Sequence, residues 1–366
     1  MNNKISRRNT FNSGSKINDQ PVICLLPRLS GIGGMVSFQE KLSEGLVRRG
    51  IKVHYTLDEA DLDSILVIGG TRNLHQLRQA KRRGIRVIQR LDGMNWIHRV
   101  MRTGLRHWLR SEYGNINLWL IRNHLADKIV YQSNFSKDWW EKVRGRTPKP
   151  SVIIHNGVDL TKFKPRDTHT KFENEIHLLL VEGSLLGGYE FGLQNAVYFA
   201  RELANQINNN SQVELAVVGK VSADIRESWQ NWLNENSRDG KVRIKWMGVV
   251  DHAKISEVYQ GADLLFSADI NAACPNAVIE SVASGTPVIS FDTGALAELV
   301  GDQGGLVVPY GGNEWKVDQP DIKSLVAGAI LILQNLAAYR KSARERAEIA
   351  FDLDLMVDRY IEVLLG

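Results

Sequence analysis

Apolar and polar residues follow one another in blocks that predict short buried strands alternating with amphipathic helices. The runs Pro21–Leu29 and Ser151–His155 are typical of buried strands, and segments with apolar residues three or four positions apart follow most such runs. Alternation of this kind favours parallel sheets covered by helices on both faces. A polar segment, Lys162–Glu175, interrupts the pattern, which resumes with the strand expected at His177–Val181. We therefore expect an α/β protein with two doubly wound domains facing each other across a ligand-binding cleft.

These patterns divide the chain into four parts. Residues 1–20 are polar and are expected to form a disordered N-terminal tail. Residues 21–165 and 166–350 hold the two α/β domains, and residues 351–366 form a last helix. A chain of 366 residues is long enough for two domains of ordinary size.

The composition argues against several classes of protein. A net charge of +5 and a pI of about 9.1 permit anionic partners without requiring nucleic acid, and no nucleic-acid partner is expected. The two cysteines, Cys24 and Cys274, indicate neither a disulfide framework nor a metal site. The nine histidines show no metal-ligand spacing, and no apolar run approaches the ~18 residues of a membrane span. We expect a cytoplasmic protein that binds no metal.

The stretch Asn271–Thr293 carries the clearest chemistry. A loop of small residues is followed by a short helix, with Asn276 expected as its N-cap, and then by the buried strand Thr286–Ser290. The N-terminus of a helix presents unpaired backbone N–H groups and a partial positive charge, so it suits a phosphate. Glu280 lies one turn into the helix, within reach of a ligand hydroxyl. The alternative is an ordinary α/β loop whose following helix happens to carry a glutamate.

The glycine-rich turn Ser30–Gly34 (SGIGG) follows the first strand and opens a helix. Its GxGG spacing differs from the dinucleotide fingerprint GxGxxG, and no convincing acidic residue follows at a strand end about 20 positions later. We therefore reject a dinucleotide site. Gly33 and Gly34 either let the backbone approach a ligand or only form a tight turn.

Several separated motifs occur in one order along the chain. They are NGVD followed by Phe163, PNAVIESVASGTPVIS (275–290) and TGALAELV (293–300), between the opening GIGGMVSFQEKLSEGLVRRG (31–50) and the ending FDLDLMVDRYIEVLLG (351–366). Together they resemble the retaining glycosyltransferases of family four, which have the GT-B fold. The resemblance runs from about Pro21 to the end of the chain. It implies two Rossmann-like domains, acceptor-side (21–165) and nucleotide-sugar-binding (166–350), with the last helix crossing back to the first domain.

The resemblance also implies roles for individual residues. In the family, amides at a helix start meet the donor diphosphate, a carboxylate contacts the ribose, and a loop of the first domain approaches the phosphates. The matching residues are Asn276, Ala277 and Val278 at the helix start, Glu280 for the ribose, Gly33 and Gly34 in the loop, and Glu298 for the acidic residue after the family's glycine pair.

Two positions depart from the family pattern. Ala272 replaces the acidic residue expected eight positions before Glu280. The segment Glu182–Gly192 lacks the arginine and lysine that neutralise the departing diphosphate in the family. The candidates to supply the missing positive charge are Arg90, Arg99 and Lys220. The alternative is a non-catalytic relative that keeps the fold as a sugar-binding or scaffolding subunit.

The segment Trp96–Arg110 predicts a basic amphipathic helix. Such a helix could lie on a membrane surface and serve a lipid-linked acceptor, or its Arg99 could join Arg90 in contacting phosphate. A third alternative is a helix packed on the core with a solvated basic face. The apolar face would hold Trp96, Ile97, Val100, Met101, Leu105, Trp108 and Leu109, and the basic face His98, Arg99, Arg102, Arg106 and Arg110.

Asp92 follows a predicted strand, on the acceptor side of the cleft. A carboxylate with a modestly raised pKa could deprotonate an acceptor hydroxyl, although Asp92 could equally cap the segment before Gly93. Asp92 and Glu280 are the two candidate catalytic residues.

The resemblance implies a retaining, metal-independent hexosyltransferase. It would move a sugar from a nucleotide-diphosphate-sugar to a hydroxyl of a glycan or a lipid-linked acceptor, as in polysaccharide biosynthesis. The nucleotide-sugar would be a co-substrate, with no further cofactor. We expect the protein in the cytoplasm or peripheral at the inner face of the membrane.

Overall fold

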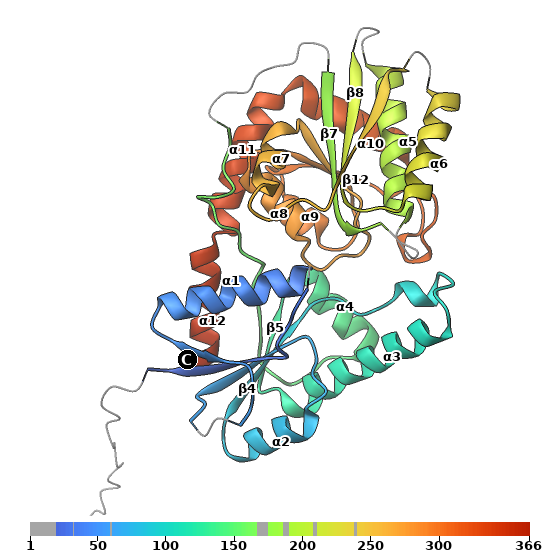
Figure 1. Ribbon diagram of the computed structural model, residues 1–366. Coiled ribbons are helices and arrows are strands. Elements are labelled where there is room, and N and C mark those ends of the chain that lie inside the picture. The colour runs from blue at the N-terminus through green and yellow to red at the C-terminus, as the bar shows by residue number, and fades with distance from the viewer. Residues whose placement is uncertain are drawn as a thin grey trace, which may run out of the picture.

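The computed structural model describes residues 20–31, 33–58, 61–166, 175–185, 190–207, 211–237 and 240–366. The predicted tail up to residue 19, residues 167–174 of the predicted linker and residues 186–189 of the Glu182–Gly192 segment lie outside these ranges. The chain forms two lobes, each built on a sheet with helices on both faces (Figure 1). This confirms the expected pair of doubly wound α/β domains.

The first sheet follows the alternation of the N-terminal half. Within the described residues it has six parallel strands in the order β2-β1-β3-β4-β5-β6. Its central strands β1 and β3 are mostly apolar and buried, as expected for a sheet with both faces covered, whereas β4 also buries the polar residues Gln89 and Arg90. The strands are β1 (Val22–Leu26), β2 (Lys52–His54), β3 (Ser64–Ile68), β4 (Arg86–Leu91), β5 (Lys128–Tyr131) and β6 (Ser151–Ile153).

The helices of this half are α1 (Gly34–Arg48), α2 (Leu74–Arg82), α3 (Leu105–Leu120) and α4 (Asn134–Arg144), with a 3₁₀ turn η1 (Ile97–Arg99) and a π turn η2 (Ile121–Leu125). The helix α1 buries one apolar stripe through Phe38, Leu42 and Leu46, whereas α3 buries the polar residues Ser111, Asn115 and Asn117.

The second sheet is also parallel and has a hydrophobic core of its own. In the part of the chain that the structure describes, its six parallel strands run in the order β12-β11-β10-β7-β8-β9. They are β7 (Glu175–Ser184), β8 (Gln212–Lys220), β9 (Val242–Gly248), β10 (Leu264–Ser267), β11 (Val288–Phe291) and β12 (Gly305–Val308). The covering helices are α5 (Glu190–Gln206), α6 (Ala223–Asn236), α7 (Ile255–Gly261), α8 (Asn276–Ala283), α9 (Leu296–Val300), α10 (Ile322–Gln334) and α11 (Leu336–Ala350), with the 3₁₀ turn η4 (Glu314–Lys316).

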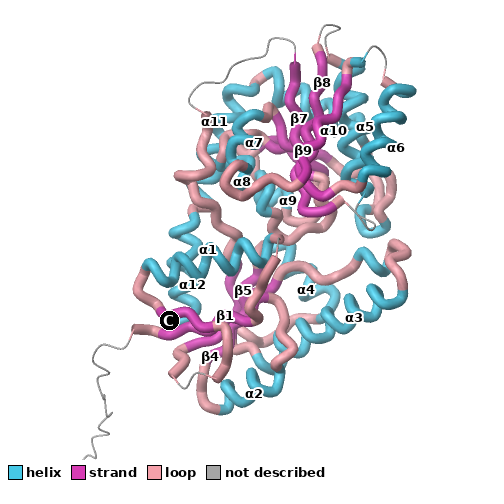
Figure 2. The backbone as a smooth tube through the Cα atoms, in the orientation of Figure 1, coloured by secondary structure: helices cyan, strands magenta, loops and turns pink. Residues whose placement is uncertain are grey.

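The last helix, α12 (Leu353–Leu365), leaves the second lobe and packs against α1 of the first, as predicted (Figures 1 and 2). Val357 and Tyr360 of α12 belong to the same buried cluster as Leu42 of α1. Gly45 of α1 allows this close approach, because a Cβ there would lie only 2.5 Å from a Val357 methyl group.

Two predicted elements need correction. The first strand ends at Leu26 rather than Leu29, because Pro27 has no N–H to offer the ladder. Residues 96–110 are not one helix: the turn η1 is separated from α3 by residues 100–104, and Gly104, with φ 85°, marks the start of α3.

Within the described residues, no single helix has the length and apolar composition to cross a bilayer. The helices α10 and α11 reach those values only as a pair, and they are bent by 96° relative to each other.

Candidate functional site

The start of α8 lies at the carboxyl edge of the second sheet and meets the start of α1 from the other lobe. A Cβ on Gly34 would lie 3.6 Å from the Asn276 Nδ2 atom. Asn156, on the chain leaving the first sheet, donates from Nδ2 to the Asn276 side-chain oxygen (2.8 Å) and to the Cys274 carbonyl (3.1 Å). The structure thus brings together the two loops that the sequence predicted to hold donor phosphates.

Asn276 does not cap α8, contrary to the sequence prediction. The helix begins at Asn276 itself, and its N-cap is Pro275, which makes no side-chain capping bond. The Asn276 amide group is used between the lobes instead, as the acceptor for Asn156. The first-turn N–H groups of Asn276, Ala277 and Val278 have no intrahelical acceptor, so the helix start can still receive an anion.

Glu280 is buried at the boundary between the lobes, with 9% of its surface exposed. The Tyr259 hydroxyl of α7 donates to its Oε2 (3.2 Å), and Lys41 Nζ of α1 lies 3.8 Å from its Oε1. Burial raises the pKa of Glu280, and the Lys41 charge opposes that rise. Lys41, which also donates to the Gly157 carbonyl (3.2 Å), was missed from the sequence because nothing in α1 predicts a partner in α8.

Asp92 lies directly beyond the carboxyl end of β4, as predicted. Its backbone carbonyl accepts hydrogen bonds from Trp140 Nε1 (2.8 Å) and from the Ser136 hydroxyl (3.0 Å), which hold the backbone of this turn. Burial raises the pKa of the Asp92 carboxyl, and the Arg90 charge lowers it. A raised pKa and a place at the strand end both suit a base, and the catalytic role of Asp92 stays a prediction.

The three predicted cations occupy different environments. Arg90 is 1% exposed, lies over the Phe38 ring at 3.8 Å and donates to the Asn156 side-chain oxygen (2.8 Å), so its guanidinium does not open into the cleft. Arg99 is paired with Glu112 through two bonds of 2.6 and 2.9 Å. Lys220 is exposed at the carboxyl end of β8, where it pairs with Ser184 of β7 in the ladder. Of the three, Lys220 is best placed for an anionic ligand.

Glu298 joins the two lobes. Its carboxylate accepts from the backbone N–H of Asn134 (2.9 Å) and of Phe135 (3.4 Å), which open α4 of the first lobe, and lies 2.8 Å from His155 Nε2. Burial acts to raise the pKa of Glu298, but the bond with His155 and the unpaired N–H groups at the helix N-terminus together hold this pKa below its ordinary value. The carboxylate predicted to bind the donor is therefore already engaged by protein groups.

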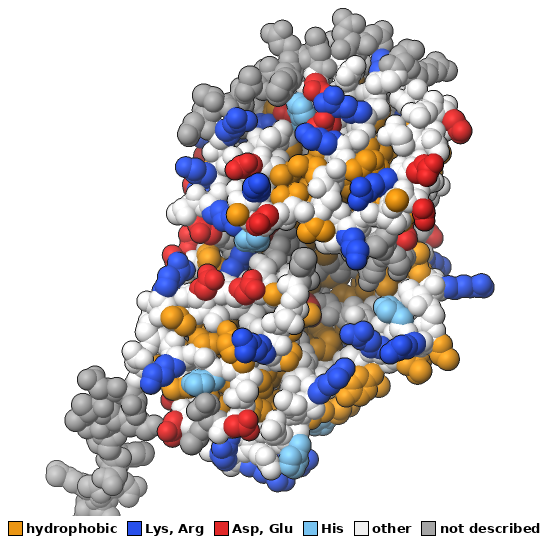
Figure 3. Space-filling model, in the orientation of Figure 1, with side chains coloured by type: hydrophobic (Ala, Val, Ile, Leu, Met, Phe, Trp, Pro, Cys, Tyr) orange, Lys and Arg blue, Asp and Glu red, His pale blue; other side chains and the backbone are white. Residues whose placement is uncertain are grey.

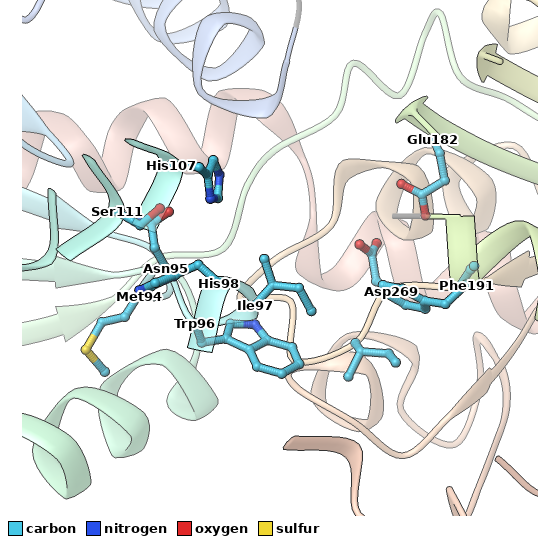
Figure 4. A pocket seen from close by; sticks show the side chains of 13 residues that line it. Met94, Asn95, Trp96, Ile97, His98, His107, Ser111, Glu182, Phe191 and Asp269 are labelled. Carbon is cyan, nitrogen blue, oxygen red and sulfur yellow. The ribbon is translucent and has the colours of Figure 1, made fainter. Parts of the chain in front are cut away.

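A cavity of about 190 Å³ lies between the lobes. Glu182 and Asp269 face it from the second lobe, and residues 94–98 with His107 and Ser111 face it from the first (Figure 4). Glu182 lies near the carboxyl end of β7, and Asp269 follows the carboxyl end of β10. The two carboxyl groups come together because these strands are neighbours in the sheet. Burial raises the pKa of Asp269 to about 6 and that of Glu182 well above its ordinary value. The sequence did not single out either residue.

Asp269→Asn is expected to stabilise the protein at pH 7.5. Because the folded-state pKa of about 6 lies above the ordinary 3.8, folding favours the protonated carboxyl, and stability falls as pH rises from about 4 to 6. A neutral amide removes that penalty, on the order of 1–3 kcal/mol. Urea unfolding at pH 7.5 and pH 4 would show the gain at the higher pH only. An equal effect at both pH values, or the same effect in the exposed control Asp302→Asn, would contradict the assignment.

The segment Trp96–Arg110 divides between this cavity and the surface. Trp96, Ile97 and His98 line the cavity. The predicted solvated basic face does not include His98, which is buried. Its Nε2 lies 2.8 Å from Oε1 of Glu112 on α3. The apolar side chains of α3 are instead exposed. They are Leu105 (75%), Trp108 (42%), Leu109 (55%), Tyr113 (59%) and Ile116 (47%).

Among the described residues, no group of three or more histidine, cysteine, aspartate or glutamate side chains could hold a metal ion.

Known proteins resemble this chain in sequence and in fold. Residues 185–335 match the model of the family described as glycosyl transferases group 1. D-inositol 3-phosphate glycosyltransferase 2 of Catenulispora acidiphila is 25% identical over 232 residues, covering 61% of this chain and 52% of that protein. Alpha-monoglucosyldiacylglycerol synthase of Streptococcus pneumoniae is 26% identical over 197 residues, covering 50% of this chain and 42% of that protein. The chain thus spans about half the length of these curated relatives.

Among solved structures, sucrose-phosphate synthase from Thermosynechococcus elongatus matches with a TM-score of 0.69 at 16% identity, over 94% of this chain and 98% of that one. WaaG, a glycosyltransferase involved in lipopolysaccharide biosynthesis, matches with a TM-score of 0.66 at 15% identity, over 94% and 100%. HepE of Anabaena, solved in complex with UDP and glucose, matches with a TM-score of 0.62 at 14% identity, over 94% and 99%. These likenesses establish the GT-B fold for this chain.

Proposed function

We propose that this protein is a glycosyltransferase that moves a sugar from a nucleotide-diphosphate-sugar to a hydroxyl acceptor, with retention of configuration and without a metal. The observation that carries the proposal is the meeting of α8 and α1 at the cleft: a helix start with unpaired amides, a buried carboxylate one turn in, and Gly34 of the opposite lobe close by. The match of residues 185–335 to glycosyl transferases group 1 supports the same reaction.

The proposed reaction gives each part of the cleft a role. The amides of Asn276, Ala277 and Val278 would hold the diphosphate and stabilise the charge that develops on it as the sugar leaves. Glu280 would accept hydrogen bonds from the ribose, with Tyr259 and Lys41 fixing its position. Lys220, exposed at the same edge of the sheet, would add positive charge where the family's basic pair is missing.

A panel of nucleotides tests this proposal most simply. Among UDP, GDP and ADP, we expect one to raise the unfolding temperature by several degrees, because a ligand at 100 times its Kd adds about 2.7 kcal/mol to folding. Thermal unfolding in parallel with the corresponding mononucleotides shows whether the second phosphate matters. If none of the diphosphates shifts the transition, the nucleotide site is refuted.

The second candidate function is a non-catalytic relative that binds sugar without turnover. Two departures from the family pattern favour this second function. Ala272 stands where an acidic residue is expected, and the segment Glu182–Gly192 lacks the expected arginine and lysine. Incubation with nucleotide-sugars separates the two: release of nucleotide that is lost in Glu280→Ala supports the enzyme, whereas tight sugar binding with no release supports the binding protein.

We further propose that the acceptor is lipid-linked and that α3 rests on an anionic membrane surface. The exposed apolar side chains of α3 recur every three or four residues from Leu105 to Ile116, and Arg102, Arg106 and Arg110 lie exposed beside them. Figure 3 shows hydrophobic and basic side chains gathered over this helix. A basic, apolar helix face complements the headgroups and acyl chains of an anionic bilayer.

Leu105→Asp and Leu109→Asp should each weaken binding to phosphatidylglycerol vesicles by about tenfold or more, because burying one leucine contributes about 1.5–3 kcal/mol. Vesicle cosedimentation measures this, with phosphatidylcholine vesicles as the uncharged comparison. The control is Leu331→Asp, which introduces the same change at a leucine of α10 that is 54% exposed. Equal binding to both vesicle types, or equal loss in the control, would contradict membrane docking by α3.

A further inference from the structure

Arg90 is a buried charge that forms no ion pair with a carboxylate in the described part of the chain. It is 1% exposed and lies over the Phe38 ring, and its Nε and Nη1 atoms have no hydrogen-bond partner among the described residues. Its Nη2 donates to the Asn156 side-chain oxygen at 2.8 Å. Burying an unpaired charge opposes folding, so a role in stability does not account for this arginine.

The hydrogen bonds around Asn156 have a fixed direction. A guanidinium can only donate, and a backbone carbonyl can only accept. The oxygen of the Asn156 amide must therefore face Arg90, and its Nδ2 must face the Cys274 carbonyl, 3.1 Å away. In this orientation the same Nδ2 also donates to the Asn276 side-chain oxygen at 2.8 Å. Asn156 is 6% exposed, so water does not compete freely for these bonds.

The same direction continues into Asn276 at the start of α8. Because the oxygen of its amide accepts from Asn156, its Nδ2 is turned away from Asn156 and toward the first lobe's loop, where a Cβ on Gly34 would lie 3.6 Å from it. Within the described residues this Nδ2 has no hydrogen-bond acceptor. It lies beside the unpaired backbone N–H groups of the helix start, so it adds a side-chain donor to a group of backbone donors.

We propose that Arg90 and Asn156 are positioning residues, which orient the Asn276 amide so that its Nδ2 donates to a phosphate oxygen of the nucleotide diphosphate. The inference rests on the proposed function, and it adds a side-chain contact to the backbone amides of α8. The opposite orientation of Asn276 would turn its oxygen toward the phosphate, and two acceptors repel each other. Arg90 thus serves the phosphate site through two hydrogen bonds in series, without contact with the ligand.

Asn156→Asp tests the direction of these hydrogen bonds. An aspartate still accepts from Arg90, but it offers no N–H to Asn276, whose amide would turn to donate to it and leave its oxygen facing Gly34. We expect the nucleoside diphosphate selected by thermal unfolding to bind at least about tenfold more weakly, because a donor to a charged group is lost. Calorimetric titration of the full chain measures this Kd. The corresponding nucleoside, measured by displacement of the diphosphate, should keep its wild-type Kd because it has no phosphate.

A cycle of single and double substitutions separates this relay from a general loss of structure. Asn276→Ala should weaken diphosphate binding by about tenfold, because it removes the proposed donor. In the Asn276→Ala protein, Asn156→Asp should change the Kd by less than about twofold, because Asn156 acts through the side chain that is already absent. Effects that multiply in the double variant would overturn the inference.

Arg90→Met removes the first donor of the series, and Arg90→Lys keeps one. The ratio of the nucleoside Kd to the diphosphate Kd should fall by about fivefold or more in Arg90→Met and stay within about threefold of the wild type in Arg90→Lys. The matched control is Arg122→Met. Arg122 is another arginine of the first lobe that is 0% exposed, and it donates to the Tyr131 hydroxyl and the Gly145 carbonyl. Its loss removes the same buried group and should leave the ratio unchanged.

The outcomes for this inference and for the proposed function are distinct. If the wild type binds a nucleoside diphosphate but the ratio is unchanged in Asn156→Asp, or falls equally in Arg122→Met, this inference alone is overturned. If Arg90→Met does not fold, Asn156→Asp decides, because it keeps a partner for Arg90. If the wild type binds no nucleoside diphosphate, the proposed function is refuted and this inference with it.

Discussion

Glu280→Ala should weaken nucleotide-diphosphate binding by about 10- to 100-fold, because hydrogen bonds to charged groups contribute about 1.5–3 kcal/mol. The carboxylate is well fixed for binding a hydroxyl, because Tyr259 donates to one oxygen at 3.2 Å and Lys41 lies 3.8 Å from the other. A ribose hydroxyl would therefore meet an acceptor that is already oriented. The measurement is the Kd from calorimetric titration with the nucleotide identified by thermal unfolding.

The same substitution also affects folding, and the two effects must be separated. Without Glu280, Lys41 is left largely buried beside an uncharged cavity, and the free energy of unfolding should fall by about 1–3 kcal/mol. Glu280→Gln keeps a partner for Tyr259 and most of the volume, so it should fold better while still losing the charge. Binding is compared well below the unfolding temperature of each variant. Wild-type affinity in folded Glu280→Ala would remove Glu280 from the site.

Gly34→Leu should reduce sugar transfer by about 100-fold with little change in stability. A Cβ at position 34 meets only the Asn276 side chain, at 3.6 Å, so the first lobe can accept it, but a longer side chain would enter the space between α1 and α8. Displacing the reacting groups by about 1 Å is enough for a loss of this size. Initial rates with the donor sugar, together with the unfolding temperature, give both quantities.

Gly34→Ala is the matched control. Its single methyl group makes an ordinary contact with Asn276, so transfer should remain close to that of the wild type. If Gly34→Leu also transfers normally, donor phosphates do not pass between α1 and α8, and the assignment of this loop is wrong.

Strands and helices that show a regular spacing of apolar residues could be predicted from the sequence. The strands expected at Ser151–His155, His177–Val181 and Thr286–Ser290 are present as β6, β7 and β11, within three residues of the expected bounds. The helix expected at Trp96–Arg110 failed because the apolar period runs across Gly104, where the backbone takes a positive φ. The spacing of apolar residues indicates which residues could share one face of a helix. It does not indicate where a glycine with a positive φ interrupts that helix.

The contacts between the lobes were not predictable. Glu298 was expected to bind the donor, yet it holds the start of α4, 164 positions earlier in the chain. Lys41 and Glu280, Asn156 and Asn276, and Glu182 and Asp269 are likewise brought together only by the fold. Each of these residues has an ordinary local sequence, so the chemistry of the pair depends on the relative placement of two sheets.

An aromatic contact shows the same dependence. Trp315 of η4, from the second lobe, packs against Trp96 (5.3 Å between ring centroids) and Trp139 (5.0 Å) of the first. Trp96 also lines the cavity between the lobes, so this contact links the relative position of the lobes to the shape of that cavity.

The central claim is that a nucleotide diphosphate binds between the two lobes at the start of α8. A crystal structure with the nucleotide selected by thermal unfolding tests it directly. We expect phosphate oxygens within about 3 Å of the backbone N–H groups of residues 276–278 and a ribose hydroxyl at a similar distance from the Glu280 carboxylate. A nucleotide bound elsewhere on the chain, with Glu280 still engaged only by Tyr259 and Lys41, would contradict the claim.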